Sequence, residues 1–195
     1  GRMSAGDVQW MKTGSGIIHS EMPAMKEGKL HGFQLWVNMP AKSKMSKPEY
    51  IYLDANKISI HKDKDKQVKI IAGKFENAEG PVKGHNLEPI YFDVELNKDK
   101  LFNFKIPATH NTFIYLINGE IKIGSNKHEN VKDSTLILLT RGEDLIVKAI
   151  SNAKFLMISG KPINEQIARG GPFVMNTKAE ILQAVQDYHN GTFVK

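Results

Sequence analysis

Hydrophobic and polar residues alternate along much of this chain, in short runs interrupted by Gly, Pro, Asn and Asp. Alternation with a period of two is typical of β-strands that bury one face. The pattern predicts strands at residues 7–12, 16–22, 30–39, 50–54, 56–61, 67–73, 90–96, 101–106, 112–118, 120–124, 134–138, 145–150 and 153–159. So many short strands indicate an all-β sandwich or barrel and not an alternating β/α fold.

The segment GIIHSEMP, residues 16–23, places a histidine two positions before a carboxylate. Side chains alternate across a strand, so Ile17, His19 and Glu21 would share one face. Imidazole and carboxylate groups are metal ligands, and two of them on one strand face suggest a metal site. The alternative is an inward His19 and Glu21 that only pair with each other.

The segment KLHGFQLWVNMP, residues 29–40, has the same period and ends at a proline. Its alternate residues form one apolar face: His31, Phe33, Leu35, Val37 and Met39. We therefore expect His31 to point inward, either as a residue that lines a metal cavity or as a hydrogen-bonded core histidine.

The next stretch, AKSKMSKPEY at residues 41–50, is polar and lacks strand periodicity, so it resembles a connector between two modules. We place the domain boundary near residue 55. The charged run HKDKDKQ, residues 61–67, has no apolar stripe and is typical of a solvated hairpin tip.

A helix is expected only near the end of the chain. Asn176 or Thr177 can act as its N-cap, Glu180 completes a capping box, and Gly191 is a stop signal. For the strands before it, we expect apolar packing from Leu116, Ile121, Leu136, Leu138, Ile146 and Leu156.

The amino-acid composition limits the kinds of metal site, nucleophile and partner that this chain can have. The 195 residues include no cysteine, so disulfides, thiolate metal sites and cysteine nucleophiles are excluded. The net charge is +6, but all except three of the 27 basic residues are scattered lysines, so we expect no direct nucleic-acid partner. No signal peptide or membrane-length apolar run is visible, which predicts a soluble, cytoplasmic protein without a membrane partner, or a nuclear one in a eukaryote.

Three motifs, in order along the chain, resemble the signature stretches of the pirins. They are GDVQWMKTGSGIIHSEMP (6–23), LHGFQLWVNMP (30–40) and GPFVMNT (171–177). The resemblance implies a bicupin, which has two antiparallel β-barrel domains in tandem. Residues 1–55 would be the remainder of an incomplete N-terminal metal-binding cupin domain, and residues 56–195 would be the C-terminal cupin domain with the terminal helix.

The resemblance also implies one iron in the N-terminal barrel, held by a His-x-His motif and a later His-x-Glu motif. His19 and Glu21 match the second pair, whereas this sequence contains no His-x-His. Roughly the first third of a pirin is therefore expected to be absent. Iron, or another divalent transition metal, normally needs three or four protein donors, so we expect this chain alone to bind it weakly or not at all.

The second barrel is expected to be metal-free and structural. Lys105, Pro107 and Asn111 stand where a cupin's first motif has its ligands, and neither an ammonium group nor proline can ligate a metal. The remaining histidines near turns or in polar stretches are expected to be solvent-exposed or locally hydrogen-bonded: His61, His85, His110 and His128.

For function, the resemblance implies a quercetin 2,3-dioxygenase, which opens a flavonol ring with molecular oxygen. The substrate would be a small aromatic, flavonol-like molecule, and Glu21 would be both a ligand and the acceptor of the flavonol hydroxyl proton. The alternative is a non-catalytic, metal-sensing co-regulator that binds a transcription factor. A third interpretation is a truncated chain with a disabled first barrel, which would expose strand edges and self-associate.

Overall fold

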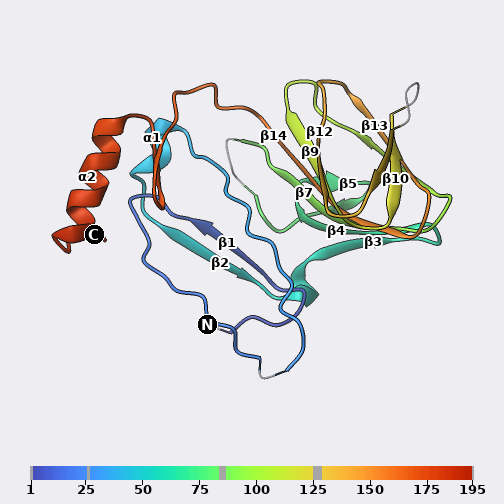
Figure 1. Ribbon diagram of the computed structural model, residues 1–195, viewed down its shortest axis with the longest axis horizontal. Helices are drawn as coiled ribbons and strands as arrows, with labels where there is room; N and C mark the ends of the chain where they lie inside the picture. Colours follow the sequence, from blue (N-terminus) through green and yellow to red (C-terminus); the bar gives the residue numbers. More distant parts are fainter. Residues whose placement is uncertain (1, 26, 84–86, 125–128, 195) are drawn as a thin grey trace. The chain divides into compact units, whose positions relative to one another are not determined.

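The computed structural model describes residues 2–25, 27–83, 87–124 and 129–194 (Figure 1). The chain divides into two compact units, each described by itself. Unit 1 comprises residues 1–52 and 163–195, and unit 2 comprises Leu53–Pro162. Residues 163–195, with the C-terminal helix, thus group with the N-terminal part of the chain, whereas the predicted C-terminal domain, 56–195, includes them.

Unit 2 consists almost entirely of short strands. They are β3 (Ser59–Lys62), β4 (Lys66–Ala72), β5 (Lys74–Phe75), β6 (Ala78–Glu79), β7 (Ile90–Leu96), β8 (Leu101–Lys105), β9 (Asn111–Asn118), β10 (Glu120–Ile123), β11 (Glu129–Lys132), β12 (Thr135–Leu138), β13 (Asp144–Ala149) and β14 (Ala153–Gly160). A single 3-10 turn, η1 (Ala55–Lys57), precedes them. The mostly-β fold is the one predicted.

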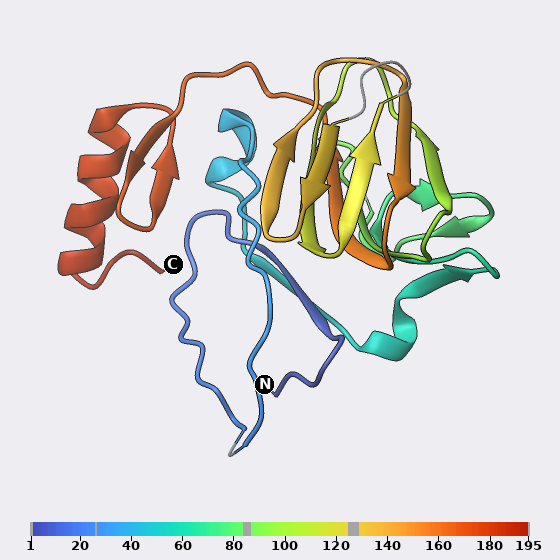
Figure 2. The same cartoon turned by 45° about the vertical axis from the view of Figure 1, so that its right-hand side comes forward.

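Two antiparallel sheets make up this unit (Figures 1 and 2). One has six strands in the order β12-β9-β14-β7-β4-β3, and the other has four in the order β11-β10-β13-β8. β5 and β6 pair separately. Apart from β5 and β6, the described strands of this unit pair as two sheets and not as one continuous ring, and large apolar side chains fill the space between these two sheets.

The core of unit 2 is aromatic at its centre. Phe92, Phe102 and Phe155 are fully buried, and the Phe102 and Phe155 rings meet edge to face with centroids 5.6 Å apart. Such edge-to-face pairs add to the stabilisation from burial alone.

Three of the six predicted core residues, Leu116, Ile121 and Leu156, are buried. The predictions for Leu136 and Leu138 are wrong, because both are exposed on the edge strand β12. Ile137, between them, packs against the core instead. Ile146 is half-buried, and its neighbours Leu145 and Val147 occupy the core positions of β13.

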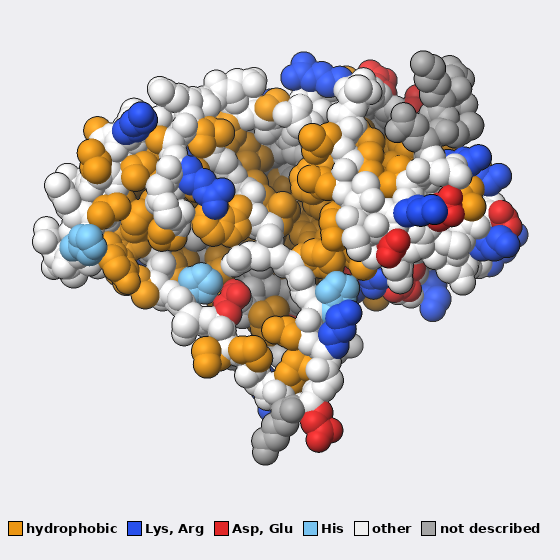
Figure 3. Space-filling view, viewed as in Figure 1, with side chains coloured by type: hydrophobic (Ala, Val, Ile, Leu, Met, Phe, Trp, Pro, Cys, Tyr) orange, Lys and Arg blue, Asp and Glu red, His pale blue; other side chains and the backbone are white. Residues whose placement is uncertain are grey.

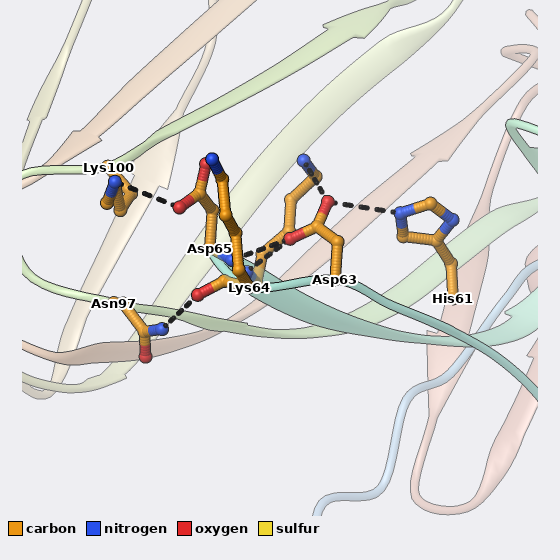
Figure 4. A network of polar contacts seen from close by, with 7 residues as sticks. His61, Asp63, Lys64, Asp65, Asn97 and Lys100 are labelled. Atoms are coloured by element: carbon orange, nitrogen blue, oxygen red, sulfur yellow. Dashed lines mark hydrogen bonds and ion pairs between the residues drawn. The ribbon is translucent and has the colours of Figure 1, made fainter.

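The charged run 61–67 forms the β3–β4 hairpin tip, as predicted (Figure 4). The Asp63 carboxylate accepts hydrogen bonds from the backbone N–H groups of Asp65 and Lys66, at 2.7 and 2.9 Å. It also pairs with the Lys66 ammonium at 2.9 Å and contacts His61 Nε2 at 3.3 Å. The polar side chains of this run therefore fold the turn itself.

Unit 1 has little regular structure. Its elements are β1 (Val8–Lys12), α1 (Ala41–Lys44), β2 (Glu49–Leu53, whose last residue falls in unit 2), β15 (Ala168–Gly170), β16 (Phe173–Met175) and α2 (Lys178–His189). The strands predicted at 16–22 and 30–39 are wrong, because both segments are coil without ladder hydrogen bonds. β1 and β2 pair only with each other, so no neighbouring strand among the described residues supplies a ladder for those segments.

The C-terminal helix α2 starts and is capped as predicted. Thr177 Oγ1 accepts the Glu180 N–H at 3.2 Å, and the Glu180 carboxylate accepts the Thr177 N–H at 2.7 Å, which completes the capping box. The helix lies along the β15–β16 hairpin (Figure 2), and Ile181 packs so closely on Gly170 that a Cβ there would come within 2.6 Å of it. Neither described helix is long and apolar enough to cross a membrane.

Candidate metal centre

The segment that carries His19 and Glu21 begins at a firmly fixed turn. The Gly16 N–H donates to the Thr13 carbonyl at 2.9 Å, and the Ser15 N–H donates to the Ser46 carbonyl at 2.8 Å. Gly16 is buried against the Phe193 ring, where a Cβ would come within 2.5 Å of a ring carbon. Its φ of +138° also favours glycine.

Beyond this turn, His19 and Glu21 both lie exposed in coil. They form no ion pair or hydrogen bond with each other within the described part of the chain, so the simple His–Glu pair considered as an alternative is not present there. The two side chains remain free to take other partners. Their chemistry, one imidazole and one carboxylate, suits iron and similar ions.

Among the described residues, a third donor is not in place. His31 was expected to point inward, but it is exposed in coil, and its ring lies beside Phe33 with centroids 5.3 Å apart. Across residues 2–25, 27–83, 87–124 and 129–194, no three His, Cys, Asp or Glu side chains are grouped closely enough to hold a metal ion. His19 and Glu21 therefore fit iron in kind but not in number.

The positions of unit 2 at which a cupin's first motif would have its metal ligands are solvent-facing. Lys105, Pro107 and Asn111 are all exposed, and the Lys105 ammonium lies 3.8 Å from the Asp144 carboxylate. That the unit binds no metal remains a prediction.

The other histidines divide into different environments. His61 is locally hydrogen-bonded to Asp63, as predicted. The expectation for His110 is wrong, because this histidine is buried and contacts Ser159, a residue distant in sequence. His85 and His128 lie outside the described residues. The signal for His110 was available, since it precedes Thr112, Ile114 and Leu116 at two-residue intervals on the buried face of β9.

A buried lysine was missed in the stretch that resembled a connector. Lys44, at the end of α1, donates to Asn38 Oδ1 and to the Val174 carbonyl at 3.3 Å. Burial lowers the pKa of Lys44, and the nearby carboxylates of Glu165 and Glu180 oppose that shift. This lysine ties the segment after the candidate ligands to the β15–β16 hairpin.

Two surface hollows are lined by residues other than His19 and Glu21. One, of about 490 Å³, is bounded by α2 and β15, where hydrophobic side chains gather at the surface (Figure 3). Its lining includes Ile167, Arg169 and Leu182. The other, of about 620 Å³, lies beside Phe104 and Asp144 in unit 2. Neither contains a candidate ligand, so neither marks the metal centre.

Comparisons with known proteins match both ends of the chain to one family. The model of the pirin C-terminal cupin domain matches residues 91–194, and the pirin model matches residues 1–37. A pirin-like protein of Caulobacter vibrioides is 36% identical over 99% of this chain and 70% of its own length. Human pirin is 34% identical over 97% of this chain and 66% of its own length. The matched relatives are thus longer than these 195 residues.

Two further similarities carry an activity in their names. A Vibrio cholerae protein to which quercetin 2,3-dioxygenase activity is provisionally assigned is 36% identical over 99% of this chain and 69% of its own length. The crystal structure of a quercetin 2,3-dioxygenase from Acinetobacter baumannii superposes with a TM-score of 0.82 at 28% identity. The superposition covers 96% of this chain and 67% of the Acinetobacter baumannii chain.

Proposed function

Because this chain belongs to the pirin family, we propose that it derives from an iron-dependent quercetin 2,3-dioxygenase, which opens a flavonol ring with molecular oxygen. The observation that carries the proposal is the His19-x-Glu21 pair, placed directly after the Thr13–Gly16 turn in a chain similar to a crystallised quercetin 2,3-dioxygenase. Iron, when bound, would supply the site at which oxygen and the flavonol meet.

In this proposal His19 and Glu21 supply two of the iron ligands. The Glu21 carboxylate also accepts the proton of the flavonol hydroxyl, because it is exposed to an incoming substrate. The turn at Gly16 anchors the segment on its N-terminal side.

The same proposal requires donors beyond these two. A divalent transition ion is held firmly by three or four protein ligands, and His31 is not positioned to be the third. We therefore propose that the 195-residue chain binds iron weakly or not at all, and that a chain extended upstream to include His-x-His forms the complete site.

Oxygen consumption with quercetin tests this function. The extended chain, loaded with ferrous iron, should consume oxygen, and its His19→Ala and Glu21→Ala variants should lose nearly all turnover while keeping the fold. Matched controls are His189→Ala and Glu27→Ala, which replace exposed residues of the same types outside the proposed site. An extended chain that binds iron but leaves quercetin and oxygen unchanged would rule out the dioxygenase proposal.

The co-regulator alternative stays a prediction. Neither the described contacts nor the names of the relatives reported above bear on a transcription-factor partner. Retention of a defined transcription factor by the iron-loaded extended chain, together with no oxygen consumption, would favour it over the enzyme.

A further inference from the structure

A buried histidine in unit 2 has one ring nitrogen without a partner. His110 is 4% exposed and lies in the turn before β9, where its backbone N–H donates to the Pro107 carbonyl at 2.9 Å. Its Nδ1 contacts Ser159 Oγ at 3.2 Å, and that hydroxyl contacts Thr112 Oγ1 at 2.8 Å. Nε2 is buried and has no hydrogen-bond partner in the described part of the chain. An unpaired buried polar atom costs about 1–3 kcal/mol, so its presence requires an explanation.

The group that faces Nε2 is the carboxylate of Glu88. Its Oε2 lies 3.9 Å from Nε2, which is too far for a hydrogen bond. The Glu88 side chain is 65% exposed, so it is free to move, and its backbone has a φ of +47°, in the left-handed region. The preceding carbonyl, of Leu87, accepts the Lys161 N–H at 2.8 Å and so joins this segment to the end of β14.

The described groups around the ring favour its neutral form at pH 7. Ser159 and Thr112 offer neutral hydroxyls from β14 and β9, Glu88 contributes a negative charge, and Lys161 contributes a positive one. Burial lowers the pKa of His110 below its ordinary value of about 6.5, Glu88 raises it, and Lys161 lowers it. The ring therefore gains its proton at a lower pH than an ordinary histidine does.

The Ser159–His110–Glu88 set is not arranged for nucleophilic catalysis. Ser159 is only 2% exposed, and its hydroxyl is already bonded to Thr112, so a substrate carbonyl cannot reach it. The arrangement suits a conformational role instead.

We propose that His110 and Glu88 form a pH-dependent latch at one end of unit 2. When His110 takes a proton from solvent, both ring nitrogens carry a hydrogen, so Nδ1–H donates to Ser159, Nε2–H becomes a donor, and the exposed Glu88 carboxylate moves in. The gap of 3.9 Å closes to the roughly 2.8 Å of a charge-assisted hydrogen bond. Residues 87–89 are then held against the ends of β9 and β14 by a second bond, whereas at neutral pH the Leu87–Lys161 hydrogen bond holds them without it.

Two NMR readouts on the 195-residue protein test the latch between pH 4.5 and 8. The His110 ring resonances should titrate below the ordinary histidine midpoint, and Glu88→Gln should lower that midpoint by about half a pH unit, because the attracting charge is removed. Exchange of the Lys161 amide, corrected for its intrinsic pH dependence, should slow by roughly threefold as His110 becomes charged.

A matched control separates the latch from a general charge effect. Glu79→Gln removes an exposed carboxylate that pairs with Lys83, and it should leave the His110 titration unchanged. Three results would each overturn the proposal: no His110 titration in this range, the same midpoint with and without Glu88, or Lys161 exchange that ignores the state of His110.

Discussion

Residues 31–39, HGFQLWVNM, and residues 110–118, HNTFIYLIN, both begin with a histidine and are rich in apolar side chains. The second segment contains β9, which pairs with β12 on one side and β14 on the other. Ile114 and Leu116 are completely buried there. The first segment forms no strand, and Phe33, Trp36 and Val37 are exposed. The difference lies in the neighbours and not in the pattern.

A strand is stable only when its backbone N–H and C=O groups have partners, and isolated two-stranded pairs are marginal in water. Unit 2 supplies a six-stranded and a four-stranded sheet, whereas the only described neighbours in the first part of the chain are β1 and β2. Alternation therefore indicates which face a strand would bury once partners exist. His19, Glu21 and His31 lie in segments without such partners, so they are exposed and not gathered.

Matched leucine substitutions should show this difference most strongly. Leu116→Ala removes a fully buried side chain from β9 and should lower the free energy of unfolding of unit 2 by about 3 kcal/mol. Leu30→Ala removes a side chain of unit 1 that is 70% exposed and should change the free energy of unfolding of unit 1 by less than about 0.5 kcal/mol. Urea denaturation measures both. Equal losses would mean that the 30–39 segment is packed in solution.

Much of unit 2 could be predicted from sequence because its strands have partners. The bounds of β7, β9 and β14 fall within about one residue of the expected ranges.

Alternation alone could not choose the core face of β12, since Leu136, Ile137 and Leu138 are all apolar. The short strands of the β15–β16 hairpin were missed because three residues are too few to show a period.

The candidate site divides in the same way. His19 and Glu21 were identified from their spacing and from the motif around them, and neither signal depends on folding. Their exposure could not be predicted, because it depends on whether other strands pair with them. Lys44 was missed because a lysine in a largely polar stretch gives no sign of burial, which here comes from its contacts with Asn38 and Val174.

The charged hairpin tip of unit 2 sharpens the comparison through its pH dependence. Hydrogen bonds from Lys66 and from the Asp65 N–H lower the pKa of Asp63 below its ordinary value. The folded state then binds fewer protons than the unfolded state, so this stabilisation is present above about pH 4 and is lost as the pH falls.

Asp63→Asn should therefore lower the melting temperature of unit 2 at pH 7, and the difference from the wild type should shrink toward pH 2. Asp144→Asn, which removes a looser and more exposed pair with Lys105, is the control and should have less effect at pH 7. Thermal unfolding followed by circular dichroism measures both variants. If the melting temperatures of Asp63→Asn and the wild type differed more as the pH fell, the stabilising role of the ionised Asp63 carboxylate would be contradicted.

Self-association is the smallest expected effect. Unpaired strand edges invite pairing with another copy, and β1 and β2 each have only one described neighbour. We expect the weight-average mass from light scattering to rise with concentration for the 195-residue chain, and to rise less for a chain extended upstream. A strict monomer at every concentration would contradict this expectation.

Equilibrium dialysis against ferrous iron under anaerobic conditions tests the central claim most directly, that His19 and Glu21 alone do not form a complete metal site. The 195-residue chain should retain far less than one iron per chain, and His19→Ala should change this amount little. The chain extended to include His-x-His should retain close to one iron per chain. The His19→Ala variant of the extended chain should lose that iron. Tight, stoichiometric iron in the 195-residue chain that disappears with His19→Ala would contradict the account, because it would mean that the missing donors are already present.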